Sequence, residues 1–310
     1  STPHATSKSL KILYIGNFHP KSVGEPEIAN ALEKLGHTVI RHPNTERPGT
    51  LDADILLFSK LTFPGHINFL RELKIPRVCW MFDLYWGYRN EKRIEHNKEQ
   101  LFQADLVLTT DGGNTDKWKK HNINHKCLRQ GIAGDVTMGS PNFATVAEIG
   151  FVGTRSPWAG WDYRPALIDW LKATYGTKFK HFGQDGSLRH EDLNDLYATL
   201  KIVVGDTVHS PNYWSNRIYE TIGRGGFLIH PLVEGIEKEF TPYKHFIPYN
   251  YGDMAGLREK INYYLQADEE REKIRQAGFE HCHKYHTYTK RARQLIDELR
   301  RINVTLIFER

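Results

Sequence analysis

Short apolar runs alternate with helical segments along the first half of the chain, and this alternation restarts near residue 148. The runs that fit buried strands are 11–16, 37–42, 53–60, 77–83 and 104–111, followed by 148–154, 178–183, 201–206, 227–231 and 245–249. Strands separated by helical segments form right-handed βαβ units and a mostly parallel sheet. The sequence therefore predicts an α/β protein with one parallel sheet in each half.

A small, polar segment, GSPNFATVA at 139–147, separates the two halves, and we interpret it as a linker. We predict two Rossmann-like domains, residues 1–142 and 143–288, that face each other across a cleft. From residue 255 onward the pattern is almost entirely helical. Its last helix, 289–310, is basic on one side and apolar on the other, and we expect it to pack back on the first domain. An amphipathic helix at a membrane surface is the alternative.

The composition excludes several classes of protein. A net charge of +5 over 310 residues suits an acidic ligand but lacks the concentrated charge of a nucleic-acid-binding arm. Three widely spaced cysteines cannot form a disulfide framework, which favours the reducing cytosol. We expect no secretory signal, because no apolar region precedes the first predicted strand. We expect no membrane span, because no apolar run approaches about 18 residues. The motifs of α/β-hydrolases, P-loop NTPases and zinc metalloproteases are also missing from the sequence.

Parallel sheets bind ligands at the carboxyl ends of their strands, so the loops that follow the predicted strands are the candidate sites. The first of these, residues 16–25, lacks the G-x-G-x-x-G fingerprint of dinucleotide-binding enzymes. Gly16 is a candidate binding residue, because glycine permits a close approach between a ligand and the backbone. His19 is a candidate catalytic residue, and Lys21 could also reach the cleft. An ordinary turn between strand and helix is the alternative.

The segment MFDLYWGYR at 81–89 places a carboxylate and several aromatic rings after a strand. Asp83 could bind hydroxyls or accept a proton, so we predict a catalytic role for it. Tyr85, Trp86 and Arg89 are predicted to contact the acceptor, because exposed aromatic rings stack on sugars and bases. The alternative for Asp83 is a cap on the helix that follows.

Two further strand exits carry candidate residues. In TTDGGN, Asp111 is a third catalytic candidate, although the Gly-Gly turn also suits a purely structural role. In FVGTRSPWAGWDYR, the backbone after the strand and Arg155 could bind a diphosphate. Trp158 and Trp161 lie in the same loop, where one of them could simply cover the sheet edge.

The segment 205–231 carries the most information about function. A strand ends at its start, and a polar loop leads to a helix with Ser215 as the predicted N-cap. Arg217 in the first turn opposes the helix dipole and needs a compensating partner, which a bound phosphate would supply. Glu220 could accept hydrogen bonds from ribose hydroxyls, or it could lie exposed on an ordinary amphipathic helix. The predicted donor-binding residues here are Tyr213, Ser215, Asn216, Arg217 and Glu220.

Three stretches together resemble a known family: SNRIYETIGRGGFLIHPLVEGIEKEF at 215–240, KHFIPY at 244–249 and HTYTKRARQLI at 286–296. They are similar to the carboxyl-terminal half of GT-B glycosyltransferases, in particular the spore-maturation-protein-like group related to retaining glycosyltransferase family four. The resemblance covers about residues 148–296. It implies transfer of a sugar from a nucleotide-diphosphate sugar, above all a UDP-sugar, to an acceptor hydroxyl. It also implies retention of anomeric configuration and no need for a metal ion.

The resemblance assigns roles to individual residues. Family members have two glutamates eight positions apart, and Glu220 matches the second, which binds the donor ribose. The first falls at Asn212, whose amide can bind sugar hydroxyls but carries no charge. Arg155 loosely matches the family's diphosphate-binding arginine. No lysine follows it in the loop, so Arg164 or Arg217 could take the place of that lysine.

The acceptor and the catalytic competence stay open at this point. The acceptor could be a small molecule, a glycan, a protein or DNA, with a flipped DNA base suggested by the pI of about 8.9 and by the aromatic loops. Asn212 suggests a non-catalytic nucleotide-sugar-binding protein as the main alternative, and an epimerase on the same framework is a third. No cofactor or metal is expected: Asp52 and Asp54 precede a strand, and His281–His286 has no second ligand pair.

Overall fold

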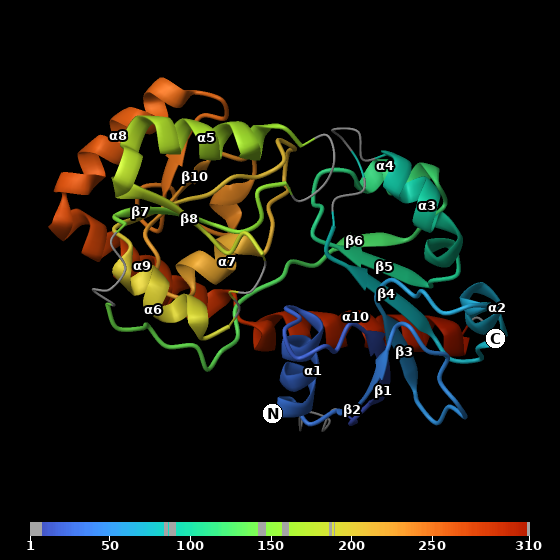
Figure 1. Cartoon of the computed structure of the whole chain (residues 1–310). Coiled ribbons are helices and arrows are strands. Elements are labelled where there is room, and N and C mark those ends of the chain that lie inside the picture. Colours follow the sequence, from blue (N-terminus) through green and yellow to red (C-terminus); the bar gives the residue numbers. More distant parts are fainter. Residues whose placement is uncertain are drawn as a thin grey trace. The chain divides into compact units, whose positions relative to one another are not determined.

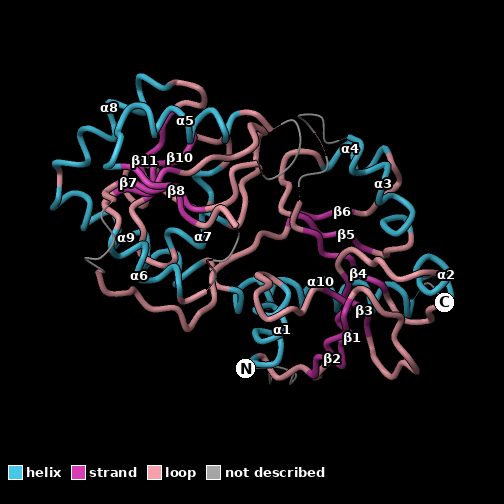
Figure 2. The backbone as a smooth tube through the Cα atoms, in the orientation of Figure 1, coloured by secondary structure: helices cyan, strands magenta, loops and turns pink. Residues whose placement is uncertain are grey.

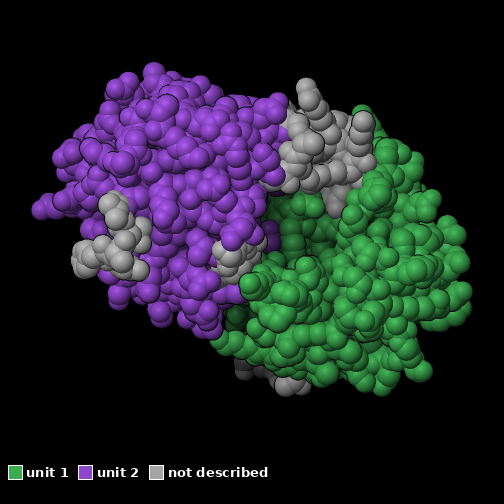
Figure 3. All heavy atoms as spheres, in the orientation of Figure 1, with its two compact units in different colours: residues 1–129, 288–310 green, residues 130–287 purple. Residues whose placement is uncertain are grey.

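The computed structural model describes residues 8–83, 86, 91–141, 147–156, 161–185, 188 and 190–308. The chain divides into two compact units, residues 1–129 with 288–310 (unit 1) and residues 130–287 (unit 2), shown in Figure 3. Each unit has a layer of strands with helices packed against it, as Figure 2 shows.

The division between the units falls after Arg129, earlier than the predicted boundary at residue 142. The physical reason is that the segment after Arg129 packs on unit 2. The Ile132 amide donates to the His286 carbonyl oxygen at 3.0 Å, and the Ser140 amide donates to Asp195 at 2.9 Å. Most of the polar stretch expected to be a linker, residues 142–146, lies outside the described residues.

The described part of unit 1 contains a six-stranded parallel sheet in the order β2-β1-β3-β4-β5-β6 (Figure 1). Its strands are β1 (Lys11–Gly16), β2 (Thr38–Pro43), β3 (Ile55–Phe58), β4 (Arg77–Met81), β5 (Leu106–Thr109) and β6 (His125–Cys127). Its helices are α1 (Glu25–Lys34), α2 (His66–Glu72), α3 (Glu91–Phe102), α4 (Thr115–Lys120) and α10 (Tyr288–Phe308).

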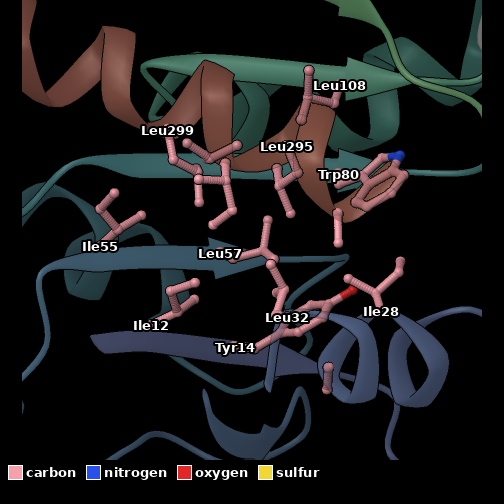
Figure 4. Close-up of a cluster of buried hydrophobic side chains, with 14 of the residues drawn as sticks. Ile12, Tyr14, Ile28, Leu32, Ile55, Leu57, Trp80, Leu108, Leu295 and Leu299 are labelled. Carbon is pink, nitrogen blue, oxygen red and sulfur yellow. The ribbon is translucent and has the colours of Figure 1, made fainter. Parts of the chain in front are cut away.

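The alternation of side chains along β1 builds a core on each face of this sheet. Ile12 and Tyr14 pack with α1 and α10, whereas Leu13 and Ile15 pack on the other face with the helices that follow β3, β4 and β5. Figure 4 shows the first of these cores, into which α10 contributes leucine side chains. Burial of each such leucine stabilises the fold by about 1.5–3 kcal/mol, so α10 belongs to the core of unit 1.

The described part of unit 2 contains a five-stranded parallel sheet in the order β11-β10-β9-β7-β8. Its strands are β7 (Ile149–Val152), β8 (Phe179–Phe182), β9 (Ile202–Val204), β10 (Leu228–Pro231) and β11 (Ile247–Tyr249). Its helices are α5 (Tyr163–Tyr175), α6 (Asp192–Thr199), α7 (Arg217–Ile222), α8 (Met254–Gln266) and α9 (Asp268–Tyr285), with short 3₁₀ turns at Gly176–Lys178 and Ile236–Lys238. The predicted fold class, an α/β protein with two parallel sheets and a C-terminal helix, is confirmed.

Two properties that bear on the cellular setting can be read directly from the fold. Within the described ranges, no helix combines the length and the apolar character needed to cross a bilayer. Cys79, Cys127 and Cys282 are all free thiols, and two of them are buried.

Candidate functional site

One candidate site surrounds Asp206 in unit 2, directly after β9. Strand β7 has β8 on one side and β9 on the other, so the topological switch point, where such sheets bind ligands, lies between β7 and β9. The Asp206 carboxylate, 1% exposed, accepts hydrogen bonds from Trp161 Nε1 (3.1 Å), Arg164 Nε (2.9 Å) and Arg217 Nη1 (3.1 Å). Burial raises the pKa of Asp206, but Arg164 and Arg217 outweigh burial, so the pKa is lowered and the group is ionised.

This edge of unit 2 carries an excess of positive charge. Two guanidinium groups share the single carboxylate of Asp206, and both lie over the ring of Phe151, at 5.6 Å for Arg164 and 5.2 Å for Arg217. Burial and the neighbouring Arg164 lower the pKa of Arg217 to about 10, which leaves it charged at neutral pH. Burial lowers the pKa of nearby His230 to about 4, so this imidazole is neutral. The cluster therefore has a formal charge of +1.

Gly153 makes the position of Arg217 possible. Gly153 follows β7 with φ of 140°, a conformation that side chains rarely adopt. A Cβ atom at this position would lie 2.6 Å from Arg217 Nη2. The Arg217 side chain is 22% exposed next to Gly153, whereas the Asp206 side chain is fully buried. An anion at the switch point can therefore reach a guanidinium that is already held in place.

The start of α7 differs from the prediction. The helix begins at Arg217 and has only six residues, and Asn216 rather than Ser215 precedes it as the N-cap residue. The Ser215 hydroxyl lies 3.4 Å from the Arg217 amide, a long hydrogen bond, and Tyr213 is buried. The compensating partner that Arg217 requires is the Asp206 carboxylate, so no bound phosphate is needed to explain its position.

Glu220 is buried, which contradicts the alternative of an exposed residue on an amphipathic helix. Its carboxylate forms an ion pair with Arg224 Nε at 2.7 Å, and Arg224 also donates to Asn194 Oδ1 at 2.6 Å. The predicted role of Glu220 in ribose binding stays a prediction.

Asn212 has a structural explanation. Its backbone adopts the left-handed region with φ of 56°, which asparagine tolerates better than most residues. The backbone N–H of Asn212 donates to the Glu234 carbonyl oxygen at 2.8 Å. Its side-chain oxygen lies so close to Gly235 that a Cβ there would clash with it. The turn therefore favours asparagine over glutamate at this position.

Arg155 is already engaged by a carboxylate. Its guanidinium donates two hydrogen bonds, both 2.7 Å long, to Asp169 of α5, and both side chains are exposed. This fork-shaped pair occupies the face of Arg155 that a diphosphate would use. Its predicted part in donor binding stays a prediction.

Aromatic rings gather next to the Asp206 cluster. The ring of Tyr251, just after β11, stacks on Tyr163 at 4.4 Å and on His209 at 4.6 Å. Trp161, which donates to Asp206, lies 5.9 Å from Tyr163. Of these residues, sequence reasoning selected only Trp161; Trp158 lies outside the described residues. The other three could have been found from their positions, because Tyr163, His209 and Tyr251 follow β7, β9 and β11.

A separate candidate site is a cavity of about 490 Å³ in unit 1. It lies at the carboxyl ends of several strands, and its lining residues are Glu25, Asn44, Ser59, Lys60, Trp80, Met81, Phe82, Asp83, His96 and Asn97. Asn44 follows β2, Ser59 follows β3 and Glu25 begins α1 after β1. Since β1 lies between β2 and β3, this cavity also surrounds a topological switch point.

Glu25 is the most unusual residue of this cavity. It is 8% exposed, and burial raises the pKa of its carboxyl group, although hydrogen bonds from backbone amides and from Ser59 act in the opposite direction. A Cβ atom on Gly16 would lie 2.9 Å from Glu25 Cγ and 3.3 Å from Ser59 Oγ. Gly16 therefore makes room for these two side chains, a role the sequence prediction did not include. Glu25 itself was missed, because acidic residues are common in the first turn of any helix.

The structure separates the predicted catalytic residues. Asp83 is exposed and lines the unit 1 cavity. His19 is exposed, does not line this cavity, and accepts a local hydrogen bond from the Lys21 amide at 3.2 Å. Asp111 is fully buried and accepts from the Gly113 amide at 2.9 Å, within its Gly-Gly turn.

The predicted acceptor-side residues are placed only in part. Tyr85 and Arg89 lie outside the described residues. The expectation that Trp86 is an exposed stacking ring is wrong, because it is 5% exposed and packs edge-on against Trp118 with ring centroids 5.7 Å apart. The apolar core of unit 1 provides a better environment for this indole than solvent does.

Metal ligation finds no support among the residues that the structure describes, where no three histidine, cysteine, aspartate or glutamate side chains form a metal-binding group. The histidines near the end of α9 make other contacts. His281 Nε2 lies 2.7 Å from the Glu239 carbonyl oxygen, and His283 Nε2 lies 2.7 Å from that of Gly223.

Comparisons with known proteins show what this chain is similar to. The family model described as "Glycosyl transferase-like" matches residues 164–297, which contain most of the unit 2 cluster. The fold resembles sucrose-phosphate synthase from Thermosynechococcus elongatus (TM-score 0.68, 12% identity, 95% of this chain and 100% of that chain). The chain has the GT-B fold.

Two further solved structures of this fold were determined with nucleotide bound. Anabaena Alr3699/HepE in complex with UDP and glucose has a TM-score of 0.61 and 14% identity, over 94% of this chain and 99% of that chain. An alpha-glucosyltransferase in complex with UDP and a 13-mer DNA has a TM-score of 0.65 and 13% identity, over 94% of this chain and 100% of that chain. No curated protein matches the sequence.

Proposed function

We propose that this GT-B protein is a glycosyltransferase that moves a sugar from a UDP-sugar to an acceptor hydroxyl. The observation that carries the proposal is the +1 cluster of Arg164, Asp206 and Arg217 at the switch point of unit 2. A sugar nucleotide presents a diphosphate to its protein, and the partly exposed Arg217 guanidinium, fixed by Asp206, suits that anion.

The neighbouring residues support a role for each part of the donor. Glu220 is proposed to bind the ribose hydroxyls, and the rings of Tyr163, His209 and Tyr251 offer a face for stacking. UDP is favoured as the nucleotide because two proteins of this fold, Anabaena HepE and the alpha-glucosyltransferase, were solved with UDP.

Charge stabilisation by arginines is the basis for proposing that no metal ion or other cofactor is needed. When the glycosidic bond to the diphosphate breaks, negative charge develops on the leaving group, and preorganised guanidinium groups stabilise such charge. Retention of configuration and membership of the spore-maturation-like group are proposed from the sequence resemblance. A cytosolic location is proposed from the three free cysteines.

A donor screen tests this function. The full chain is incubated with UDP-, GDP- and ADP-sugars, and release of the nucleoside diphosphate is measured with and without EDTA. We expect release from a UDP-sugar that EDTA does not abolish, and a loss of about tenfold or more in UDP affinity for Arg217→Ala. Arg258→Ala, an exposed arginine of α8, is the matched control. Failure of the wild-type chain to bind UDP would overturn the proposal.

A non-catalytic nucleotide-sugar-binding protein is the second candidate, because Asn212 stands where the related enzymes have a glutamate. The same screen separates the two functions. A binding protein would bind UDP-sugars by calorimetry, with affinity reduced in Arg217→Ala, but would release no UDP during prolonged incubation.

A further inference from the structure

The unit 1 cavity has a distinctive chemistry. Amide, hydroxyl and carboxyl groups reach it from different segments: Glu25, Asn44, Ser59, Asp83 and Asn97. Trp80, Met81 and Phe82, around the end of β4, also line the cavity, and of these three the half-buried Phe82 supplies the apolar surface that a ligand can reach. Its volume of about 490 Å³ lies within the range of roughly 300–1,000 Å³ that is usual for small-molecule sites.

The charges of this cavity disfavour an anionic ligand. Its lining contains two carboxyl groups, Glu25 and Asp83, and one lysine, Lys60, which is exposed. With both carboxyl groups ionised the lining has a formal charge of −1, the opposite sign to the unit 2 cluster. A DNA phosphate or another polyanion would meet repulsion here rather than attraction.

Glu25 is available to a ligand in a way that Asp206 is not. Among the described residues Glu25 forms no ion pair, and the charged group that acts most on it is another carboxylate, Glu27. Its protein hydrogen bonds come from backbone amides and from Ser59. A buried carboxyl group with no cation gains from additional hydrogen-bond donors, and sugar hydroxyls are such donors.

We propose that this cavity binds the acceptor, and that the acceptor is a neutral polyhydroxylated molecule of the carbohydrate class. Glu25 and the amides of Asn44 and Asn97 hydrogen-bond its hydroxyl groups, while the half-buried ring of Phe82 packs against the C–H face of its ring. The inference deepens the proposed glycosyltransferase function and rests on it.

The test is direct binding of free carbohydrates to the full chain. Methyl glycosides of the common hexoses, myo-inositol and a 13-mer DNA duplex are titrated by saturation-transfer NMR in the presence of UDP. We expect at least one carbohydrate to bind with an affinity that changes little with salt, and Glu25→Gln to weaken it about tenfold. Glu33→Gln, an exposed glutamate on the same helix, is the matched control and leaves the affinity unchanged.

Two further measurements keep the outcome interpretable. Thermal unfolding shows whether Glu25→Gln and a second variant, Asp83→Asn at an exposed position of the lining, are folded. Asp83→Asn should also weaken carbohydrate binding. This inference fails, and the proposed function stands, if UDP binds and UDP-sugars are hydrolysed but no carbohydrate binds. The inference also fails if the DNA duplex binds instead, with a steep salt dependence. If UDP does not bind at all, the proposed function itself fails.

Discussion

Asp206 and Glu25 occupy comparable places in the two units, since each is buried beside the switch point of a parallel sheet, yet their surroundings are opposite. Asp206 is held by two guanidinium groups and an indole, which lower its pKa despite burial. Among the described residues, the hydrogen bonds to Glu25 come from backbone amides and from the Ser59 hydroxyl, and burial raises its pKa. The difference teaches that a buried carboxylate can serve to fix cations for an anionic ligand or can itself be the ligand-binding group.

Removal of the Asp206 carboxylate should have the largest effect. Asp206→Ala leaves two guanidinium groups close together without their shared counter-ion, so we expect a loss of about 3–5 kcal/mol in the free energy of unfolding. Urea denaturation at pH 7 measures this loss. A change below about 1 kcal/mol would show that the two arginines do not need the Asp206 carboxylate as their counter-ion. The contrast between Asp206, held by cations, and Glu25 would then be wrong.

The low pKa of Asp206 also gives this stabilisation a pH dependence. The contribution of the ionised group is present above the ordinary aspartate pKa of about 3.9 and is lost as the pH falls through the lower pKa of the folded state. The stability difference between wild type and Asp206→Asn should therefore shrink as the pH is lowered from 5 toward 2. Denaturation curves across this range show whether it does; a constant difference would contradict the assigned ionisation.

Arg217 and Arg155 allow a comparison within unit 2. Arg217→Ala should weaken UDP binding by about 10- to 100-fold, since hydrogen bonds to charged groups contribute roughly 1.5–3 kcal/mol. Arg155→Ala should have a smaller effect, because its guanidinium is already held by exposed Asp169. Isothermal titration calorimetry of both variants ranks them, and an equal or larger loss for Arg155→Ala would move the diphosphate site away from Asp206.

Gly153 tests whether the backbone sets the position of Arg217. Gly153→Ala places a Cβ 2.6 Å from Arg217 Nη2 in a strained backbone conformation, so we expect a destabilisation of about 1–3 kcal/mol together with weaker UDP binding. Gly176→Ala is a useful control, because its φ of 54° is also positive but nothing lies near its Cβ position. Equal UDP affinities for the two variants would show that steric contact with Arg217 is unimportant.

The smallest effect is expected from Glu25. Because the fold raises the pKa of this group, the stabilisation of its protonated form is complete below the ordinary glutamate pKa of about 4.3 and is lost as the pH rises through the folded value. The free energy of unfolding of Glu25→Gln should therefore rise relative to that of wild type between pH 4 and pH 7. This change should be smaller than the loss expected for Asp206→Ala. Denaturation at both pH values measures the shift, and a shift of opposite sign would mean that Glu25 has a hidden cationic partner.

The architecture was predictable from the sequence because it depends on local patterns. The apolar runs that end in glycine or aspartate, and the helical segments between them, are sufficient to indicate two parallel sheets. The restart at Ile149 marks the first strand of the second sheet. These local patterns do not predict which unit the polar stretch after Arg129 packs against. That depends on tertiary contacts such as the hydrogen bond between Ile132 and His286.

The site was less predictable, since burial decides the role of each charged side chain. Arg217 could be recognised from its unfavourable place in a helix's first turn, but its partner Asp206 looked like the end of an ordinary strand. Glu25 resembled any acidic residue at a helix start. Trp86 lay in a predicted loop, and nothing local distinguishes an exposed indole from one that packs on Trp118.

Helix α10 makes unit 1 discontinuous in the sequence, so its core can be completed only after unit 2 has been translated. Leu295 and Leu299 complete the same core as Ile12 and Leu57 of the first strands, although the whole of unit 2 is translated between them. All of unit 2, residues 130–287, is therefore translated between the strands of unit 1 and the helix that completes their core. A chain cut after residue 287 would keep every strand described above and still expose the face of unit 1 that α10 covers.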